Sequence, residues 1–434
     1  MYTSIDNFDS KIYVNEKNND KRHIKYEDYK FHTFDKSKKG NYIDLFGESY
    51  KRIYRNLYEY YDKKNEIGVI SPEQQYIYEN YNFNEDEQYK VNICFLDIET
   101  SSIYSFPNID NPIEDIQLIG LYFNGIYTIY GIKELDNNSI YIKDLPNLNY
   151  IYCKSQKELL LRFFNYLNVN EIDLISGWNS HGFDIPYIIE KTKFIENIDK
   201  KEKNTYLNYF SPYNKIVDIK NSLVRKYKEK YKVYGLQHLD YMELYKKFGK
   251  SQENYKLNFI GEVELGIGKE KYDDDYKDLN ELYEKNYELF VRYNYRDVEI
   301  LNKIDKKLGL MELVKSISYY AGINFEDVYS PIKTWDSIIY RQLMNKNTIV
   351  VKNDMNIENE EFPGAYVFDV KEGLNEWIIS YDFASLYPTI LRSYCMSYET
   401  LLVEDEKNIE IEKQQNELKK QLELINNEIK KRNI

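Results

Sequence analysis

The chain has 434 residues, of which 42% are hydrophobic and 16% aromatic, with only 17 Gly and 9 Pro. This length exceeds what one hydrophobic core supports, so we expect two or three domains, and the composition excludes disordered and collagen-like classes. The net charge of -13 argues against a protein that coats nucleic acid through a global positive field. A local basic groove and clustered carboxylates for divalent metals are both compatible with this charge.

The sequence predicts neither a membrane segment nor a disulfide framework. No stretch approaches the roughly 18 uninterrupted apolar residues of a membrane span, and the first residues lack a basic flank followed by an apolar stretch. Cys94, Cys153 and Cys395 are far apart and lie in apolar or tyrosine-rich segments. We therefore expect buried free thiols in a reducing compartment, and no zinc knuckle.

Residues 1–93 predict a mixed, polar first domain rich in Lys, Asp, Asn and Tyr. Short apolar bursts such as residues 11–14 interrupt it, and residues 50–61 predict a helix.

The next segment has the alternation of an α/β domain. Residues 91–100 (VNICFLDIET) form an apolar run that closes on acids, which indicates a central strand buried on both faces. Further strands are expected at residues 116–122, 127–130 and 172–176, with a helix over 156–167.

Helical spacing dominates the second half of the chain. Residues 278–308 predict one long helix, 332–344 predict another, and 377–381 predict a strand that runs into an acid. Residues 404–434 predict an amphipathic helix. Its apolar residues at heptad spacing are Ile411, Leu418, Leu422, Ile425 and Ile429.

Three groups of acids stand where chemistry is possible. Asp97 and Glu99 are two apart on a strand, so they project from one face, although either could simply be solvated at the strand end. Asp184 begins a predicted helix and could be an ordinary N-cap. Tyr293 and Asp297 are four apart on a helix and share a face, as an ordinary hydrogen-bonded pair would.

Together, Asp-x-Glu, Asn-x-x-x-Phe-Asp and Tyr-x-x-x-Asp occur in the order that resembles the proofreading 3′-5′ exonuclease of family B DNA polymerases. The resemblance implies a ribonuclease-H-like sheet on which Asp97, Glu99, Asp184 and Asp297 hold two divalent metals, Mg²⁺ or Mn²⁺. Two such ions, about 3.5 to 4 Å apart, generate hydroxide from water and stabilise the departing 3′ oxygen. Tyr293 would orient the water or the scissile phosphate.

Flanking segments are similar to the replicative polymerases of T-even-type bacteriophages. The similar segments are residues 235–248 (GLQHLDYMELYKKF), 264–272 (ELGIGKEKY) and 328–338 (VYSPIKTWDSI). By this resemblance Lys269 lies near the exonuclease metals, and the protein acts in the cytoplasm of an infected bacterial host.

Contacts with single-stranded and primer-template DNA are expected from two sources. The run 225–232 (RKYKEKYK) interleaves cations with tyrosines, which suits phosphate contact and base stacking, although charge runs are often solvated faces. Related polymerases carry a strand-separating β-hairpin here, but this segment is short for a large one. The predicted nucleic-acid-binding residues are Asn179, Phe183, Arg225, Lys226, Lys228, Lys269 and Gly364.

Residues 381–390 (YDFASLYPTI) resemble the first palm motif of family B polymerases. There Asp382 would ligate the catalytic metals, and backbone N–H groups would hold triphosphate oxygens. Tyr387 would lie under the sugar and exclude a 2′-hydroxyl. The predicted nucleotide-binding residues are Phe383, Ser385, Leu386 and Tyr387. A capped helix start with a surface Asp is the alternative.

The family's fingers pattern and second palm carboxylate do not occur in these 434 residues. We therefore expect the amino-terminal subunit of a split phage polymerase, completed by a second chain that carries the remaining palm, fingers, thumb and sliding-clamp contact. A nonenzymatic nucleic-acid-binding remnant or regulator is the alternative. The expected divisions are an N-terminal domain (1–93), the exonuclease domain (94–309), a return segment (310–353), a partial palm (354–403) and an assembly helix (404–434).

Overall fold

The computed structural model describes residues 1–18, 21–44, 47–60, 70–81, 90–198, 206–219, 230–272, 275–350, 368–369, 372–397, 400, 418 and 420. The chain divides into two compact units. The first comprises Met1–Thr33 and Ile53–Asn345, and the second Phe34–Arg52 and Lys346–Ile434. Within the described part of the chain, no helix has the length and apolar character needed to cross a bilayer.

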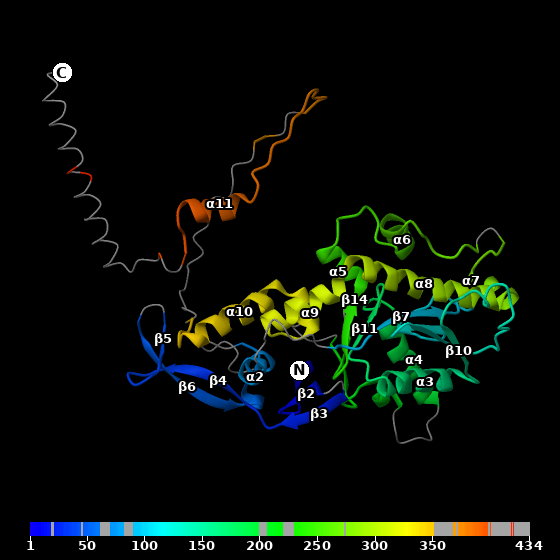
Figure 1. The fold of residues 1–434 in the computed structure, drawn as a ribbon, viewed down its shortest axis with the longest axis horizontal. Coiled ribbons are helices and arrows are strands. Elements are labelled where there is room, and N and C mark those ends of the chain that lie inside the picture. The colour runs from blue at the N-terminus through cyan, green and yellow to red at the C-terminus, as the bar shows by residue number, and fades with distance from the viewer. Residues whose placement is uncertain are drawn as a thin grey trace. The chain divides into compact units, whose positions relative to one another are not determined.

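The first unit is built on a six-stranded mixed sheet in the order β10-β9-β8-β7-β11-β14 (Figure 1). β7 runs antiparallel to β8 and parallel to β11, so the strand expected at residues 91–100 is confirmed as central. β9 is antiparallel to β8, whereas β10 and β14 are parallel to β9 and β11. The strands are Ile93–Thr100 (β7), Ile116–Phe123 (β8), Ile126–Gly131 (β9), Leu148–Tyr152 (β10), Leu174–Gly177 (β11) and Gln237–Asp240 (β14).

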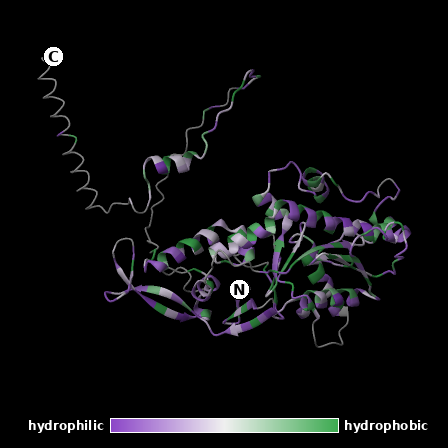
Figure 2. Ribbon diagram, in the orientation of Figure 1, coloured by the Kyte–Doolittle hydropathy of each residue, from purple (hydrophilic) through white to green (hydrophobic). Residues whose placement is uncertain are grey.

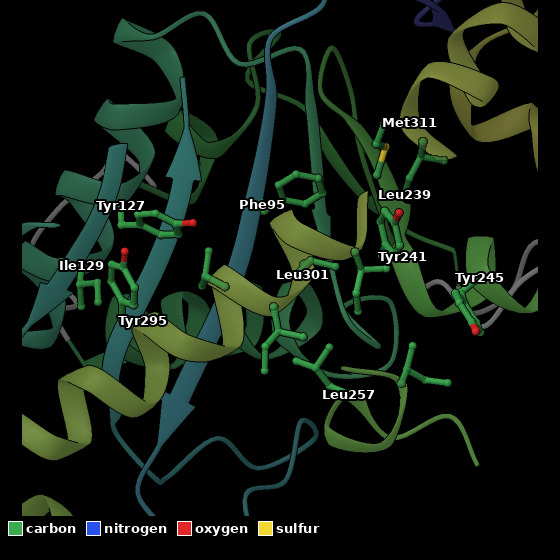
Figure 3. Close-up of a cluster of buried hydrophobic side chains, with 14 of the residues drawn as sticks. Phe95, Tyr127, Ile129, Leu239, Tyr241, Tyr245, Leu257, Tyr295, Leu301 and Met311 are labelled. Carbon is green, nitrogen blue, oxygen red and sulfur yellow. The ribbon is translucent and has the colours of Figure 1, made fainter. Parts of the chain in front are cut away.

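Helices cover both faces of this sheet, and both faces carry hydrophobic residues (Figure 2). Cys94, Leu96 and Ile98 of β7 pack in the cluster that includes helices α3 (Gln156–Val169) and α4 (Asp184–Ile198). Phe95 packs in the opposite cluster with α8 (Tyr287–Leu308), as Figure 3 shows. Because successive strand side chains point to opposite faces, Asp97 and Glu99 lie on the α8 side of the sheet.

The N-terminal residues form an antiparallel sheet in the order β1-β2-β3. Its strands are Tyr2–Phe8 (β1), Lys11–Asn18 (β2) and Lys21–Glu27 (β3). A short antiparallel pair, β12 and β13, spans Ile216–Asp218 and Tyr231–Val233. Further helical elements of the first unit are α2 (Pro72–Asn80), η2 (Tyr206–Phe210), α5 (Tyr241–Phe248), α6 (Leu257–Leu265), α9 (Leu310–Ala321), η3 (Phe325–Tyr329) and α10 (Pro331–Asn345).

The helix predicted over residues 50–61 is wrong. Residues Ser49–Asn56 form β6, the middle strand of a sheet in the order β4-β6-β5, followed by the short 3₁₀ helix η1 (Leu57–Glu59). β4 comprises Lys30–Lys36, and β5 comprises Tyr42–Ile43. Strand neighbours on both sides accept and donate the backbone hydrogen bonds of β6, and its Tyr and Ile residues favour an extended chain.

The single helix predicted over residues 278–308 is interrupted. It consists of α7 (Leu279–Lys285) and α8 (Tyr287–Leu308), with Asn286 between them at φ -147° and ψ 77°. The Asn286 side chain accepts a hydrogen bond from the backbone N–H of Leu289 at 3.1 Å. Asparagine competes with helix propagation in this way, so it ends one helix and caps the next.

In the second unit, residues 377–381 are exposed and form no strand, so that prediction is wrong. No strand in the described part of the chain pairs with them, and an isolated strand has no partner for its backbone groups. Helix α11 (Leu386–Ser393) follows. All three cysteines are free, but Cys395 is exposed, contrary to expectation, because no element in the described ranges covers the end of α11. The helix predicted over 404–434 lies outside the described residues, apart from positions 418 and 420.

Candidate metal centre

Two elements distant in sequence bring three carboxylates together. β7 supplies Asp97, which is half-buried, and Glu99, which is 8% exposed. α8 supplies Asp297, which is 2% exposed. One carboxylate oxygen from each of these residues lies within 4.8 Å of the others.

A glycine on the neighbouring strand permits α8 to approach the sheet closely. Gly120 on β8 pairs with Asp97 across the ladder. A Cβ atom at position 120 would lie 2.1 Å from Oδ1 of Asn294, which is one helix position after Tyr293. A side chain larger than hydrogen at position 120 would therefore displace the Asn294 side chain, and it would press on Val298 of the same helix.

Asp184 lies beside this group but is oriented differently. It begins α4, is 5% exposed, and its Oδ1 accepts a hydrogen bond from the backbone N–H of Ile98 at 3.1 Å. Ile98 separates Asp97 from Glu99 on β7. The fourth predicted acid thus contacts the backbone between the other two, and it is more than the helix cap that was its alternative.

Lys269 approaches the carboxylates from the loop after α6. Its Nζ atom lies 2.5 Å from Oδ2 of Asp297 and donates a hydrogen bond to the Tyr293 hydroxyl at 3.0 Å. The backbone N–H of Lys269 donates to Oδ1 of Asn258 at 2.7 Å, which holds the loop. Lys269, Tyr293 and Asp297 therefore form one connected group.

Burial and mutual repulsion raise the pKa values of the acids. Burial, reinforced by Asp297, raises the pKa of Glu99 to about 8 and that of Asp97 well above its usual range. Burial likewise raises the pKa of Asp184 to about 7. The pKa of Asp297 is raised by burial, although the Lys269 ammonium opposes the rise. Three buried acids and one half-buried acid beside one lysine therefore require further positive charge to ionise together.

This donor set fits a divalent metal. Oδ1 of Asp297 is buried and has no hydrogen-bond partner among the described residues, so it is available to a cation. Carboxylate oxygens are the ligands that Mg²⁺ and Mn²⁺ prefer. Asp97, Glu99 and Asp297 are thus positioned to hold an ion, with Asp184 adjacent.

An exposed aromatic loop next to the acids was not predicted. Ile103, Tyr104 and Phe106 follow β7 directly and are 65%, 79% and 87% exposed. Buried Glu114 anchors the loop, since its carboxylate accepts hydrogen bonds from the Ser101 hydroxyl at 2.5 Å and from three successive backbone N–H groups. Two exposed aromatics shortly after Asp-x-Glu are the only sequence signal for this loop.

The other predicted nucleic-acid residues are partly described. Asn179 is exposed, has φ 62°, and its backbone N–H donates to Oδ1 of Asp240 at 3.0 Å. Phe183 is half-buried and stacks on Tyr187, with ring centroids 5.2 Å apart. Strand β12 precedes the basic run, and the last two residues of the run begin β13, which pairs with β12. Arg225, Lys226, Lys228 and Gly364 lie outside the described residues.

The predicted palm residues lie in the second unit at the start of α11. All of them are exposed, and Ser385 stands at the N-cap position with φ 52° and makes no side-chain capping hydrogen bond. Within the described ranges, no cluster of three metal-ligating side chains forms around Asp382. The palm residues are Asp382, Phe383, Ser385, Leu386 and Tyr387.

Two parts of the chain match domains of a known protein family. Residues 54–260 match the exonuclease domain of DNA polymerase family B, a ribonuclease-H-like domain, and residues 332–432 match the DNA polymerase family B domain. The first match contains Asp97, Glu99 and Asp184, whereas Asp297 lies beyond its end.

Several curated polymerases are similar over long stretches. The DNA-directed DNA polymerase of Enterobacteria phage T4 is 34% identical over 261 residues, covering 59% of this chain and 28% of that protein. The DNA-directed DNA polymerase of Escherichia phage RB69 is 28% identical over 416 residues, covering 88% and 44%. DNA polymerase 1 of Sulfurisphaera ohwakuensis is 27% identical over 275 residues, covering 59% and 29%. The chain thus spans less than half the length of these relatives. Both domain matches, together with the mixed sheet that carries the acids, show that the chain belongs to DNA polymerase family B.

Proposed function

We propose that this chain is a divalent-metal-dependent 3′-5′ exonuclease that removes nucleotides from single-stranded DNA ends, and so proofreads. The observation that carries the proposal is the meeting of Asp97, Glu99 and Asp297 within 4.8 Å, with Asp184 bound to the same strand. The match of residues 54–260 to the family's exonuclease domain supports the same activity.

In this proposal, Asp97, Glu99, Asp184 and Asp297 hold two Mg²⁺ or Mn²⁺ ions. Bound metal would activate water and stabilise charge on the scissile phosphate and the departing 3′ oxygen. Lys269 lies between Asp297 and Tyr293, where its ammonium partly neutralises the acids and holds the Tyr293 hydroxyl. That hydroxyl would orient the attacking water or the phosphate.

The substrate class follows from the surface beside the acids. Tyr104 and Phe106 present aromatic rings to solvent, and unpaired bases stack on such rings without sequence preference. Asn179, Phe183 and Lys269 are the nearer proposed DNA contacts. We also propose DNA contacts for the basic residues Arg225, Lys226 and Lys228 and for Gly364, which lie outside the described residues.

The experiment is digestion of 5′-labelled single-stranded DNA by the purified chain with Mg²⁺ or Mn²⁺. We expect products shortened from the 3′ end, and none from the Asp97→Ala, Glu99→Ala double variant, because two ligands are removed together. Asp305→Ala is a matched control on α8, since this acid binds the Tyr241 hydroxyl at 3.0 Å instead. Undiminished digestion by the double variant would refute the assignment.

We further propose that nucleotide incorporation requires carboxylates outside these 434 residues, supplied by a second polypeptide with the remaining palm, fingers and thumb. The match of residues 332–432 to the family's polymerase domain, with Asp382 inside it, supports a palm role for this region. Phe383, Ser385, Leu386 and Tyr387 would then contact the incoming nucleotide, and a sliding clamp would bind through the second polypeptide. The divisions 1–93, 94–309, 310–353, 354–403 and 404–434 are part of this proposal.

A further inference from the structure

Asn294 is fully buried on α8, between the two residues of that helix expected to act at the metal centre. Its Nδ2 donates a hydrogen bond to Oδ2 of Asp97 at 2.8 Å, across 197 positions of sequence. Its other amide atom, Oδ1, has no hydrogen-bond partner among the described residues. The amide therefore faces the carboxylate with its donor side.

The neighbouring strand holds this amide in place. Oδ1 of Asn294 lies 2.1 Å from where a Cβ atom at position 120 would be, so the amide occupies space that any larger residue there would take from it. Gly120 on β8 also pairs with Asp97 on β7 in the sheet ladder. The space that receives the Asn294 amide therefore lies directly beside the Asp97 carboxylate. Asn294 thus has little freedom to turn away from Asp97.

We infer that Asn294 is a positioning residue that fixes the Asp97 carboxylate for metal binding, a conclusion that rests on the proposed exonuclease centre. By occupying Oδ2, the amide holds the carboxylate group in one orientation and leaves Oδ1 of Asp97 to the cation. A neutral donor suits this place, because an acid there would add another negative charge to four carboxylates. Partners that orient a metal ligand in this way typically contribute about 10- to 100-fold to metal affinity.

The test is Mn²⁺ binding to the full 434-residue chain, measured by calorimetry without DNA. We expect Asn294→Leu to weaken Mn²⁺ binding about 10- to 100-fold. Asn294→Ala removes the amide without adding bulk and should behave alike, which covers the case in which leucine does not fit. Asn302→Leu is the matched control, since Asn302 is a buried amide two turns further along α8 that donates to the Tyr127 hydroxyl at 3.0 Å. It should bind Mn²⁺ as the unmodified chain does.

Activity supplies a second readout that a merely structural role would not alter. The Mn²⁺ concentration for half-maximal DNA digestion should rise for Asn294→Ala, and excess Mn²⁺ should restore most of the rate. If both Asn294 variants bind Mn²⁺ as tightly as the unmodified chain, the positioning role is refuted and the exonuclease proposal stands. If the unmodified chain binds no Mn²⁺, the metal centre itself is refuted, and the positioning role with it.

Discussion

Tyr293 and Lys269 show how single side chains prepare this site. The Tyr293 hydroxyl accepts a hydrogen bond from Lys269, whose ammonium also contacts Asp297, so a phenol, an amine and a carboxylate are linked before any substrate arrives. The tyrosine is 8% exposed, and its hydroxyl lies on the side of α8 that carries Asp297. Its hydroxyl, rather than its ring, is the group with a direct role in the proposal.

Replacing Tyr293 by Phe should slow DNA digestion by about 10- to 100-fold, because a misplaced reactant loses this much. Mn²⁺ affinity should stay unchanged, since every carboxylate remains. Tyr295→Phe, on the same helix, is the control, because that hydroxyl donates to the Pro146 carbonyl at 2.9 Å instead. Equal digestion rates for the two variants would remove Tyr293 from the mechanism.

The acids also predict how stability varies with pH. Without metal, the folded-state pKa values of Glu99 and Asp184 are raised to about 8 and about 7. The folded state therefore holds protons that the unfolded chain releases. The contribution of these protons to the free energy of unfolding is present at low pH and is lost as pH rises through 7 to 8. We expect the melting temperature in EDTA to fall between pH 6 and pH 9, by the equivalent of a few kcal/mol.

Two comparisons check the cause of this fall. Glu99→Gln should flatten the decline, because a neutral amide has no proton to release. Saturating Mn²⁺ should raise the melting temperature more at pH 8 than at pH 6, since the metal competes with protons for the same oxygens. A melting temperature in EDTA that does not change between pH 6 and pH 9 would contradict the raised pKa values.

At the scale of elements, the loop after β7 connects the candidate metal centre to the proposed DNA-binding surface. Glu114 holds the loop through the Ser101 hydroxyl and three backbone N–H groups, and these hydrogen bonds lower its pKa despite burial, which acts to raise it. The carboxylate is therefore ionised and rigidly bound. The backbone of residues 103–105, which carries Tyr104 and leads to Phe106, is consequently anchored a few residues after Asp97 and Glu99.

Tyr104→Ala and Phe106→Ala should each weaken binding of single-stranded DNA by about 1 to 3 kcal/mol, the usual contribution of one stacked base. Glu114→Ala should weaken it as well, because the unsatisfied N–H groups release the loop. Mn²⁺ affinity should be unaffected in all three variants. The control is Tyr320→Ala, another exposed tyrosine, on α9. DNA titrations in Ca²⁺, which supports no cleavage of this kind, would measure these affinities, and unchanged values would refute the stacking surface.

At the scale of the whole molecule, the two compact units differ in how much of their described apolar surface is buried. The first has hydrophobic clusters on both faces of its sheet. In the second, the residues from Trp377 to Met396 are exposed throughout, including large apolar side chains on α11. Apolar surface of this extent typically marks a place where further protein surface packs.

The chain by itself should therefore shorten a primer but not extend it. Primer extension with all four deoxynucleotides should yield no longer products until a polypeptide carrying the remaining palm, fingers and thumb is added. Asp382→Asn should then abolish extension and leave 3′ digestion unchanged. Extension by the unmodified chain alone would refute the need for further carboxylates.

The role proposed for residues 404–434 is tested in the same reconstituted system. Their heptad spacing predicts a helix that needs a partner face, since about four heptads are marginal alone in water. Deleting these residues should weaken complex formation and extension together. If both persist unaltered after the deletion, the segment is a solvated tail and its assembly role is wrong.

The sequence by itself determined the elements whose signals are local. The apolar run closing on Asp97 and Glu99 predicted the central strand, and the acids were identified from spacing and family resemblance together. Asp184 was placed at a helix start in the same way, and the mixed α/β class followed from the alternation of strands and helices. Such features depend on neighbours a few positions away, which a linear sequence records directly.

Only the tertiary structure decided which distant groups meet. β6 was predicted as a helix because its strand partners on both sides, which lie elsewhere in the sequence, are what stabilise the extended form that its Tyr and Ile residues permit. No sequence signal marked Asn294 as a site residue, because its partner Asp97 lies 197 positions away. The room for its side chain also depends on Gly120, which belongs to a third element. Glu114 likewise has no local pattern that marks it as the anchor of an aromatic loop. These contacts form only when the sheet and α8 pack together, because hydrogen bonds of a buried side chain are set by what the fold places beside it.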